Sequence, residues 1–242
     1  MSRISSIGSP ERESVGGAAP GVESGASQTS VYVHFPYCAR KCPYCDFATR
    51  GLPASSIPHV EYADAVLAEL RERAPQLPGR TLRSVFFGGG TPSLWDTAQL
   101  GRTLAGILEA FPERASDLEI TVECNPSSFS DDKARALADA GVNRVSLGVQ
   151  SMNDERLRFL GRLHDSEQAL AALRVATWNF KRVSADFMFG MPDQESAALR
   201  DELARVLDLG VHHVSCYALT IEPTTGLGLR ILSLICGVST GW

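Results

Sequence analysis

The stretch VYVHFPYCARKCPYCDF, from Val31 to Phe47, decides how the rest of the chain is interpreted. It opens with a short apolar run typical of a strand and continues into a segment that carries Cys38, Cys42 and Cys45 in a CxxxCxxC spacing. Thiolates this close in sequence can converge from one loop, and sulfur ligands favour iron–sulfur clusters or zinc over magnesium or calcium. Because most cubane clusters take four cysteines, a cluster held by these three would leave one iron open to an outside ligand.

Two other interpretations of the cysteine triplet stay open. The thiols could be reduced packing residues, or they could bind zinc with His34 as a fourth ligand. Zinc sites usually pair CxxC knuckles from two chain segments, and the sequence holds no second knuckle.

Composition limits the class of protein. The chain has 242 residues and a net charge of −5, which argues against a broad nucleic-acid interface. It has no apolar run of about 18 residues, so we expect no membrane span, and its N-terminus lacks the apolar core of a secretory signal. Free cysteines at metal spacing fit a reducing compartment, which predicts a cytoplasmic protein.

The order of segments along the chain predicts an α/β fold. Residues 1–30 are rich in Gly, Ser and Ala, and we expect a disordered tail there. Helix-like segments then alternate with six strand-like runs, which predicts parallel βαβ units. Right-handed crossovers would curl such units into a barrel or an open, doubly wound sheet. Since a closed barrel has eight units, six favour a partial (β/α)₆ barrel. The six runs are Val31–Phe35, Leu82–Phe87, Leu118–Val122, Arg144–Val149, Val183–Phe189 and His213–Leu219.

Unusual residues gather at the ends of the predicted strands, where parallel α/β folds place their active sites. The glycine run at 88–90 could be a tight turn or a bare backbone that a ligand approaches closely. Glu123 and Asp186 could form ion pairs with Arg144 or Arg162, or they could accept hydrogen bonds from ribose hydroxyls or an ammonium group.

Five motifs, in this order, closely resemble one protein family. VYVHFPYCARKCPYCDF, FFGGGTPS, ITVECNP, RVSLGVQSM and DFMFGMPDQ are similar to radical S-adenosylmethionine (SAM) proteins of the coproporphyrinogen dehydrogenase/HemW group. The resemblance implies a partial barrel with a [4Fe–4S] cluster whose open iron is chelated by SAM. It also implies that Cys38, Cys42 and Cys45 hold the cluster. The positions that match SAM contacts are Tyr32, Tyr44, Gly89, Gly90, Thr91, Glu123, Gln150, Arg162, Asp186 and Ala218.

One position separates two branches of that family. The coproporphyrinogen dehydrogenases resemble CxxxCxxCxC, whereas the position two after Cys45 is Phe47 here, as in the HemW branch of haem chaperones. The resemblance therefore implies haem as a further ligand, with a haem-acceptor protein and an electron donor as unidentified partners. The alternatives are an oxygen-independent coproporphyrinogen III oxidase and a zinc-stabilised α/β binding module.

The resemblance fades after Pro223. The sequence has no HNxxYW segment, which the family often carries further on. We therefore expect a core domain over residues 31–222 and a divergent tail over residues 223–242 of a truncated chain, which puts haem transfer by this chain in doubt.

Overall fold

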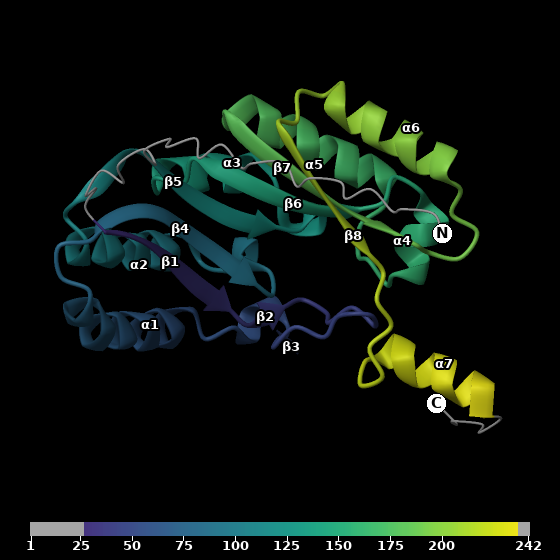
Figure 1. Cartoon of the computed structure of the whole chain (residues 1–242), viewed down its shortest axis with the longest axis horizontal. Helices are drawn as coiled ribbons and strands as arrows, with labels where there is room; N and C mark the ends of the chain where they lie inside the picture. The colour runs from purple at the N-terminus through teal and green to yellow at the C-terminus, as the bar shows by residue number, and fades with distance from the viewer. Residues whose placement is uncertain (1–26, 237–242) are drawn as a thin grey trace, which may run out of the picture.

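One curved sheet of six parallel strands organises the fold (Figure 1). The computed structural model describes residues 27–236, with side chains as far as Leu234. The strands of this sheet are β1 (Gln28–Phe35), β4 (Thr81–Gly89), β5 (Arg114–Cys124), β6 (Arg144–Gln150), β7 (Arg182–Phe189) and β8 (His213–Ala218). The helices are α1 (His59–Arg73), α2 (Thr97–Ala110), α3 (Asp131–Asp139), α4 (Asp154–Phe159), α5 (Ser166–Asn179), α6 (Ser196–Leu207) and α7 (Gly226–Cys236).

Strand order confirms the predicted α/β architecture. The order is β1-β4-β5-β6-β7-β8, and each neighbouring pair is parallel. β1 and β8 form the two edges, so the sheet stays open like part of a barrel. A two-residue ladder between β2 (Tyr37–Cys38) and β3 (Arg50–Gly51) closes the base of the cysteine loop. Short 3₁₀ turns occupy Ala54–Ser56, Ala74–Gln76, Pro92–Leu94 and Pro126–Ser128.

Regular secondary structure extends beyond both ends of residues 31–222. Strand β1 begins at Gln28, inside the stretch expected to be disordered, and Ser27 accepts a hydrogen bond from the Thr81 N–H. Residues 1–26 lie outside the described part of the chain. In the predicted tail, α7 follows β8, and the backbone N–H of Leu227 donates to Pro43 across 2.7 Å. The tail therefore contacts the cysteine loop.

Residues that favour helix ends cap α2 and α3. Asp96 caps α2 by accepting a hydrogen bond from the Gln99 N–H, and Leu100, Leu104 and Ile107 are buried on one face of this helix. Gly141 follows α3 with φ +99°, and its neighbour Val142 donates back to Leu137. That 6→1 bond marks a Schellman motif, which favours glycine because of the left-handed backbone.

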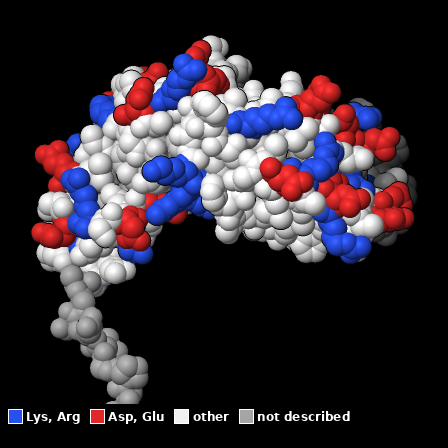
Figure 2. Space-filling view, turned by 90° about the horizontal axis from the view of Figure 1, so that it is seen from above, with Lys and Arg blue, Asp and Glu red and all other residues white. Residues whose placement is uncertain are grey.

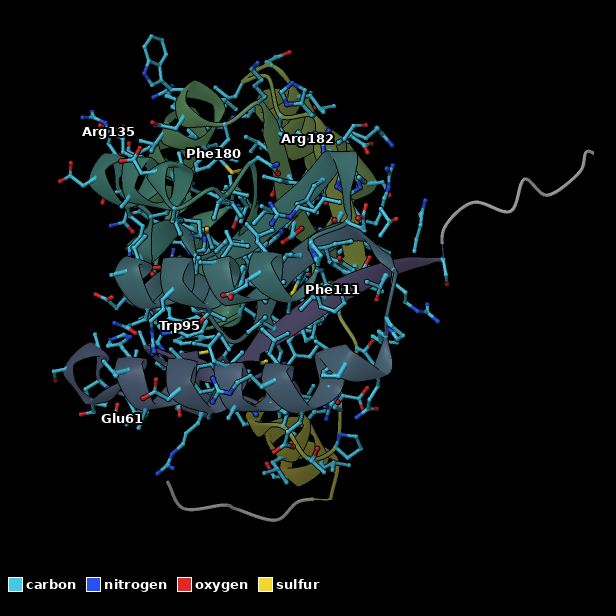
Figure 3. The ribbon with its side chains drawn as sticks, turned by 90° about the vertical axis from the view of Figure 1, so that its left-hand side faces the viewer. Glu61, Trp95, Phe111, Arg135, Phe180 and Arg182 are labelled. Carbon is cyan, nitrogen blue, oxygen red and sulfur yellow. The ribbon has the colours of Figure 1, made fainter. Side chains whose placement is uncertain are left out.

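An aromatic cluster fixes the first helix to the sheet near the cysteine loop. Phe35, at the end of β1, stacks on Trp95 with ring centroids 5.2 Å apart, and both rings are buried. The indole N–H of Trp95 donates to the carbonyl of His59 at the start of α1 across 3.1 Å (Figure 3). Burying rings of this size stabilises the fold by about 2 kcal/mol each, so this cluster anchors α1 to the sheet beside the loop.

Charges of both signs are interspersed on the face shown in Figure 2. On that face neither sign of charge gathers into a broad patch. No helix in the described part of the chain combines the length and apolarity needed to cross a membrane.

Candidate cofactor-binding site

A cavity of about 400 Å³ opens at the carboxyl ends of the strands. Of the predicted site residues, all except Tyr32 line it. They come from the cysteine loop, the glycine run at the end of β4, strands β5 to β8 and the turn after α4. These lining residues are Cys38, Cys42, Tyr44, Cys45, Gly89, Gly90, Thr91, Glu123, Gln150, Arg162, Asp186 and Ala218.

The cysteine loop is braced by its own backbone. The N–H of Cys45 donates to Cys42 across 3.1 Å, and Leu52 donates to Cys38 across 2.8 Å. All three thiols are half-buried, and burial is the main cause that raises the pKa of Cys38. Within residues 27–236, no three His, Cys, Asp or Glu side chains lie close enough to hold a single metal ion. A [4Fe–4S] cluster has a cysteine position for each iron, so its ligands need not meet at one point, and three thiols on one cavity fit such a cluster.

Both nitrogens of the His34 ring have hydrogen-bond partners other than the cysteines. Its Nε2 donates to the Ala48 carbonyl across 2.9 Å, and its Nδ1 lies 3.0 Å from the Tyr32 hydroxyl. With both ring nitrogens engaged, this arrangement does not offer the fourth ligand that the zinc interpretation assigned to His34.

Packing explains why glycine occupies positions 89 and 90, where β4 ends and turns toward the cysteine loop. Gly89 has φ +109°, and a Cβ there would lie 2.7 Å from the His34 ring. A Cβ on Gly90 would lie 2.6 Å from the carbonyl oxygen of Tyr37, to whose chain segment the turn is hydrogen-bonded through the N–H of Thr91. The tight-turn interpretation therefore holds, and the turn also lines the cavity.

Two carboxylates face the cavity without an ion pair. Glu123 accepts a hydrogen bond from the Gly89 N–H across 3.0 Å, and Asp186 accepts one from the Ser146 hydroxyl at 3.1 Å. None of the ion pairs among the described residues includes either carboxylate. Burial raises the pKa of Glu123 to about 7 and raises the pKa of Asp186 as well. A cationic or hydroxyl-rich ligand would supply the missing partners.

Arg162 lies where the cysteine loop meets α4. The helix ends in a Schellman motif at Gly161, whose φ is +66°, and Arg162 donates its backbone N–H to Leu157. Its guanidinium donates to the Gly148 carbonyl across 2.7 Å and lies 3.6 Å from the Cys42 sulfur. Its Nε is buried without a hydrogen-bond partner in the described structure. An unsatisfied buried donor on a cavity wall marks a place for an acceptor.

Tyr32 is the predicted site residue that the structure sets apart. Its ring is 57% exposed and stacks on Phe86 with centroids 6.0 Å apart. Partial burial, and to a smaller extent the nearby Glu123 carboxylate, raises the pKa of its hydroxyl. A contact between Tyr32 and a cofactor stays a prediction.

The sequence interpretation missed several cavity residues that alternation could have found. Side chains two apart on a strand share a face, so Ser146 and Gly148 lie on the same side of β6 as Gln150. In the same way Met188 follows Asp186 on β7. All of these residues line the cavity. Thr220 and Glu222 also line it, beyond the end of β8, and no periodic signal marks them.

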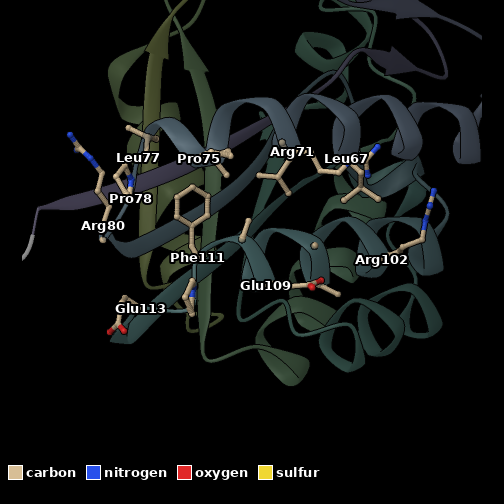
Figure 4. A pocket seen from close by; sticks show the side chains of 17 residues that line it. Leu67, Arg71, Pro75, Leu77, Pro78, Arg80, Arg102, Glu109, Phe111 and Glu113 are labelled. Atoms are coloured by element: carbon tan, nitrogen blue, oxygen red, sulfur yellow. The ribbon is translucent and has the colours of Figure 1, made fainter.

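A second hollow, of about 790 Å³, lies between α1 and α2 (Figure 4). It is lined mainly by apolar side chains such as Leu67, Leu77 and Phe111, with charged residues such as Arg80 around them. It sits beside the starts of β4 and β5, at the opposite ends of the strands from the cysteines. None of the predicted site residues lines it.

Comparison with known proteins decides the family. The family model described as "Radical SAM superfamily" matches residues 32–215. The chain belongs to the radical SAM superfamily. Membership implies a [4Fe–4S] cluster and SAM as cofactors, which agrees with three cysteines on one cavity.

Curated relatives of this radical SAM chain include haem chaperones. It is 39% identical over 202 residues to the heme chaperone HemW of Escherichia coli, covering 83% of this chain and 53% of that protein. It is 36% identical over 236 residues to the mouse mitochondrial radical S-adenosyl methionine domain-containing protein 1, covering 95% of this chain and 49% of that protein. The chain thus spans about half the length of these relatives.

Solved structures support the same fold. Coproporphyrinogen III oxidase (HemN) from Escherichia coli, described as a radical SAM enzyme, superposes with a TM-score of 0.72 at 30% identity over 84% of this chain and 47% of that one. The radical SAM methyltransferase TsrM from Kitasatospora setae, solved with cobalamin and a [4Fe–4S] cluster, gives a TM-score of 0.60 at 20% identity over 89% of this chain and 41% of that one. The second likeness concerns the fold alone.

Proposed function

We propose that this chain is a [4Fe–4S]- and SAM-binding haem chaperone of the HemW type. The observation that carries the proposal is the cavity wall, where Cys38, Cys42 and Cys45 stand together and Phe47 occupies the place of a further cysteine. The relatives named heme chaperone HemW support the same assignment. A reducing cytoplasm is part of the proposal, although the names of some relatives place them in mitochondria.

The cavity residues divide by the chemistry of SAM. The three thiolates would hold the cluster, and Arg162 with its unpartnered Nε would bind a carboxylate. Glu123 and Asp186 would accept hydrogen bonds from ribose hydroxyls or the ammonium group. When bound, the cluster and SAM together supply one-electron chemistry at the sulfonium, and the chain orients and shields them.

Two exposed aromatic rings on the cavity wall suit a flat apolar ligand. Phe47 is 64% exposed and Tyr217 is 57% exposed, and both line the cavity. Leaving large rings in water is unfavourable unless a ligand covers them. We include in the proposal that these rings contact haem, which an unidentified acceptor protein would receive.

Metal analysis tests the cluster. After anaerobic reconstitution with iron and sulfide, the wild type should hold about four irons per chain. Cys42→Ala should lose the cluster, whereas Cys216→Ala, on exposed β8, should keep it. The addition of SAM should change the electron paramagnetic resonance spectrum of the reduced cluster. Zinc bound in place of iron would instead support the zinc-stabilised module.

Haem titration tests the chaperone assignment. The reconstituted chain should form a defined complex with about one haem, and Phe47→Ala or Tyr217→Ala should weaken it about 10-fold, the size expected for the loss of one buried ring. Trp178→Ala is the control, because that ring is exposed and is not among the cavity residues. Weak, non-saturating haem binding by the wild type would contradict the chaperone proposal.

The likeness to HemN favours one alternative, an oxygen-independent coproporphyrinogen III oxidase. Anaerobic turnover with coproporphyrinogen III, SAM and a reductant separates the two functions. Vinyl-containing products would support the oxidase. Their absence, together with stoichiometric haem binding, would support the chaperone.

A further inference from the structure

Glu202 is a buried carboxylate that lies on α6 and outside the cavity wall. We propose that Glu202 is the positioning residue that holds Gln150 and Arg162 in place at the cofactor cavity. The proposal rests on the proposed function in one respect, namely that these two residues contact SAM.

The Glu202 carboxylate accepts hydrogen bonds from three donors, two in the segment between β6 and α4 and one within α4. One oxygen accepts the Ser151 hydroxyl at 2.7 Å and the backbone N–H of Met152 at 2.6 Å. The other oxygen pairs with the Arg156 guanidinium. The side chain of Glu202 is 8% exposed and that of Arg156 is 15% exposed, so water screens this ion pair poorly. Charge-assisted bonds in such a setting are strong and geometrically demanding.

The first donors directly follow Gln150, which has an unusual backbone. Its φ is +69°, a left-handed conformation that costs a residue with a side chain about 1 kcal/mol. Such a conformation persists only when its surroundings fix it. The bonds from Ser151 and Met152 to Glu202 supply that restraint at the two next residues. They therefore hold Gln150 on the cavity wall.

The third donor belongs to the helix that leads to Arg162. Asn153 caps α4, and Arg156 lies in its first turns, so the ion pair ties the helix to α6. Arg162 follows the helix directly and bonds back to Leu157. A Cβ on Gly148 would lie 3.0 Å from the Gln150 amide nitrogen and 3.4 Å from an Arg162 guanidinium nitrogen. Gln150 and Arg162 thus converge beside one strand, and Glu202 restrains the backbone of both.

Glu202→Gln tests the restraint with almost no change in volume. The amide offers one acceptor oxygen in place of two, so its NH₂ group must face either Arg156 or the Ser151 and Met152 donors. The matched control is Asp201→Asn, because Asp201 is exposed and precedes Glu202 on the same helix. Ser151→Ala is a second variant that removes one of the three bonds and little volume.

Three measurements on the full chain separate a loss of the backbone restraint from a loss of the cluster and from weaker SAM binding. Amide hydrogen exchange in the cluster-free protein should become faster at residues 150–153 in Glu202→Gln and stay unchanged in Asp201→Asn. Iron content after reconstitution should stay at the wild-type level, since the polar partners of Glu202 in the described structure are Ser151, Met152 and Arg156 and not the cysteine loop. The dissociation constant for SAM, measured by equilibrium dialysis, should rise about 10-fold in Glu202→Gln and less in Ser151→Ala.

The outcomes distinguish this inference from the proposed function. Wild-type protein that binds no cluster or no SAM would overturn the proposed function, whereas faster exchange at residues 150–153 would still support the restraint by Glu202. Wild-type SAM affinity in Glu202→Gln would overturn the positioning role. If Glu202→Gln does not fold, Ser151→Ala decides: weaker SAM binding with full iron content supports the role, and unchanged binding overturns it.

Discussion

The backbone N–H of Gly89 donates a hydrogen bond to the Glu123 carboxylate across 3.0 Å, which joins the ends of β4 and β5 at the cavity. Gly89 can approach this closely because its φ is +109° and it has no side chain. Burial raises the pKa of Glu123 to about 7, and the hydrogen bond from Gly89 and the nearby Asp186 act in opposite directions on it. This buried carboxyl group therefore titrates near neutral pH.

Glu123→Gln should change how the stability of the cluster-free protein depends on pH. Between about pH 4.5 and about pH 7 the unfolded chain ionises this carboxyl before the folded chain does. The free energy of unfolding should therefore fall through this window as pH rises, by up to about 3 kcal/mol in the wild type. The variant should lose this fall and be the more stable protein above pH 7. Urea unfolding at a series of pH values measures both.

A suitable control for that experiment is Glu113→Gln, which changes an exposed carboxylate before β5. It should leave the pH profile parallel to that of the wild type. An unchanged profile in Glu123→Gln would contradict the raised pKa.

Gly90→Ala should destabilise the chain by about 2 kcal/mol. The new Cβ would lie 2.6 Å from the Tyr37 carbonyl oxygen and 2.9 Å from that of Phe35, and backbone atoms cannot move away cheaply. Gly101→Ala is the matched control. Gly101 lies within α2, and a Cβ there would meet only the Ala140 side chain, at 3.5 Å. That variant should gain about 0.5–1 kcal/mol from helix propensity. Thermal unfolding of the two variants should shift in opposite directions, and equal shifts would show that packing does not explain the glycine turn.

Much of the fold could be predicted because its signals are local. Alternating strand and helix patterns gave the six parallel strands, and Asp96 and Gly141 are residue types that favour the helix ends where the structure places them. The start of β1 was missed because Gln28–Ser30 are polar, and their pairing with β4 is a tertiary contact that the local sequence does not encode. Composition alone therefore did not indicate that the first strand starts at Gln28.

The site residues could be predicted where residue type and spacing indicate a function, and only partly where tertiary structure brings them to the cavity. The spacing of three cysteines on one loop indicates a metal site directly, whereas Arg162 was assigned through the family resemblance alone. Its place beside Cys42 depends on the end of α4 at Gly161. The role of Glu202 could not be predicted from the sequence, because a carboxylate on an amphipathic helix usually faces water. Only packing shows that this one is buried.

Arg40 joins the cysteine loop to the end of α4, and its removal should loosen that contact. Its guanidinium donates to the Gly161 carbonyl across 2.6 Å and to that of Arg162 across 3.3 Å. A cation at the carbonyl end of a helix is worth about 1 kcal/mol at an exposed position. Arg40→Ala should therefore lower the free energy of unfolding by about that amount and speed the release of iron to a chelator. Arg50→Ala removes another exposed arginine at the base of the same loop and should release iron at the wild-type rate. If both variants released iron equally faster than the wild type, overall charge, and not the contact between loop and helix, would govern retention of the cluster.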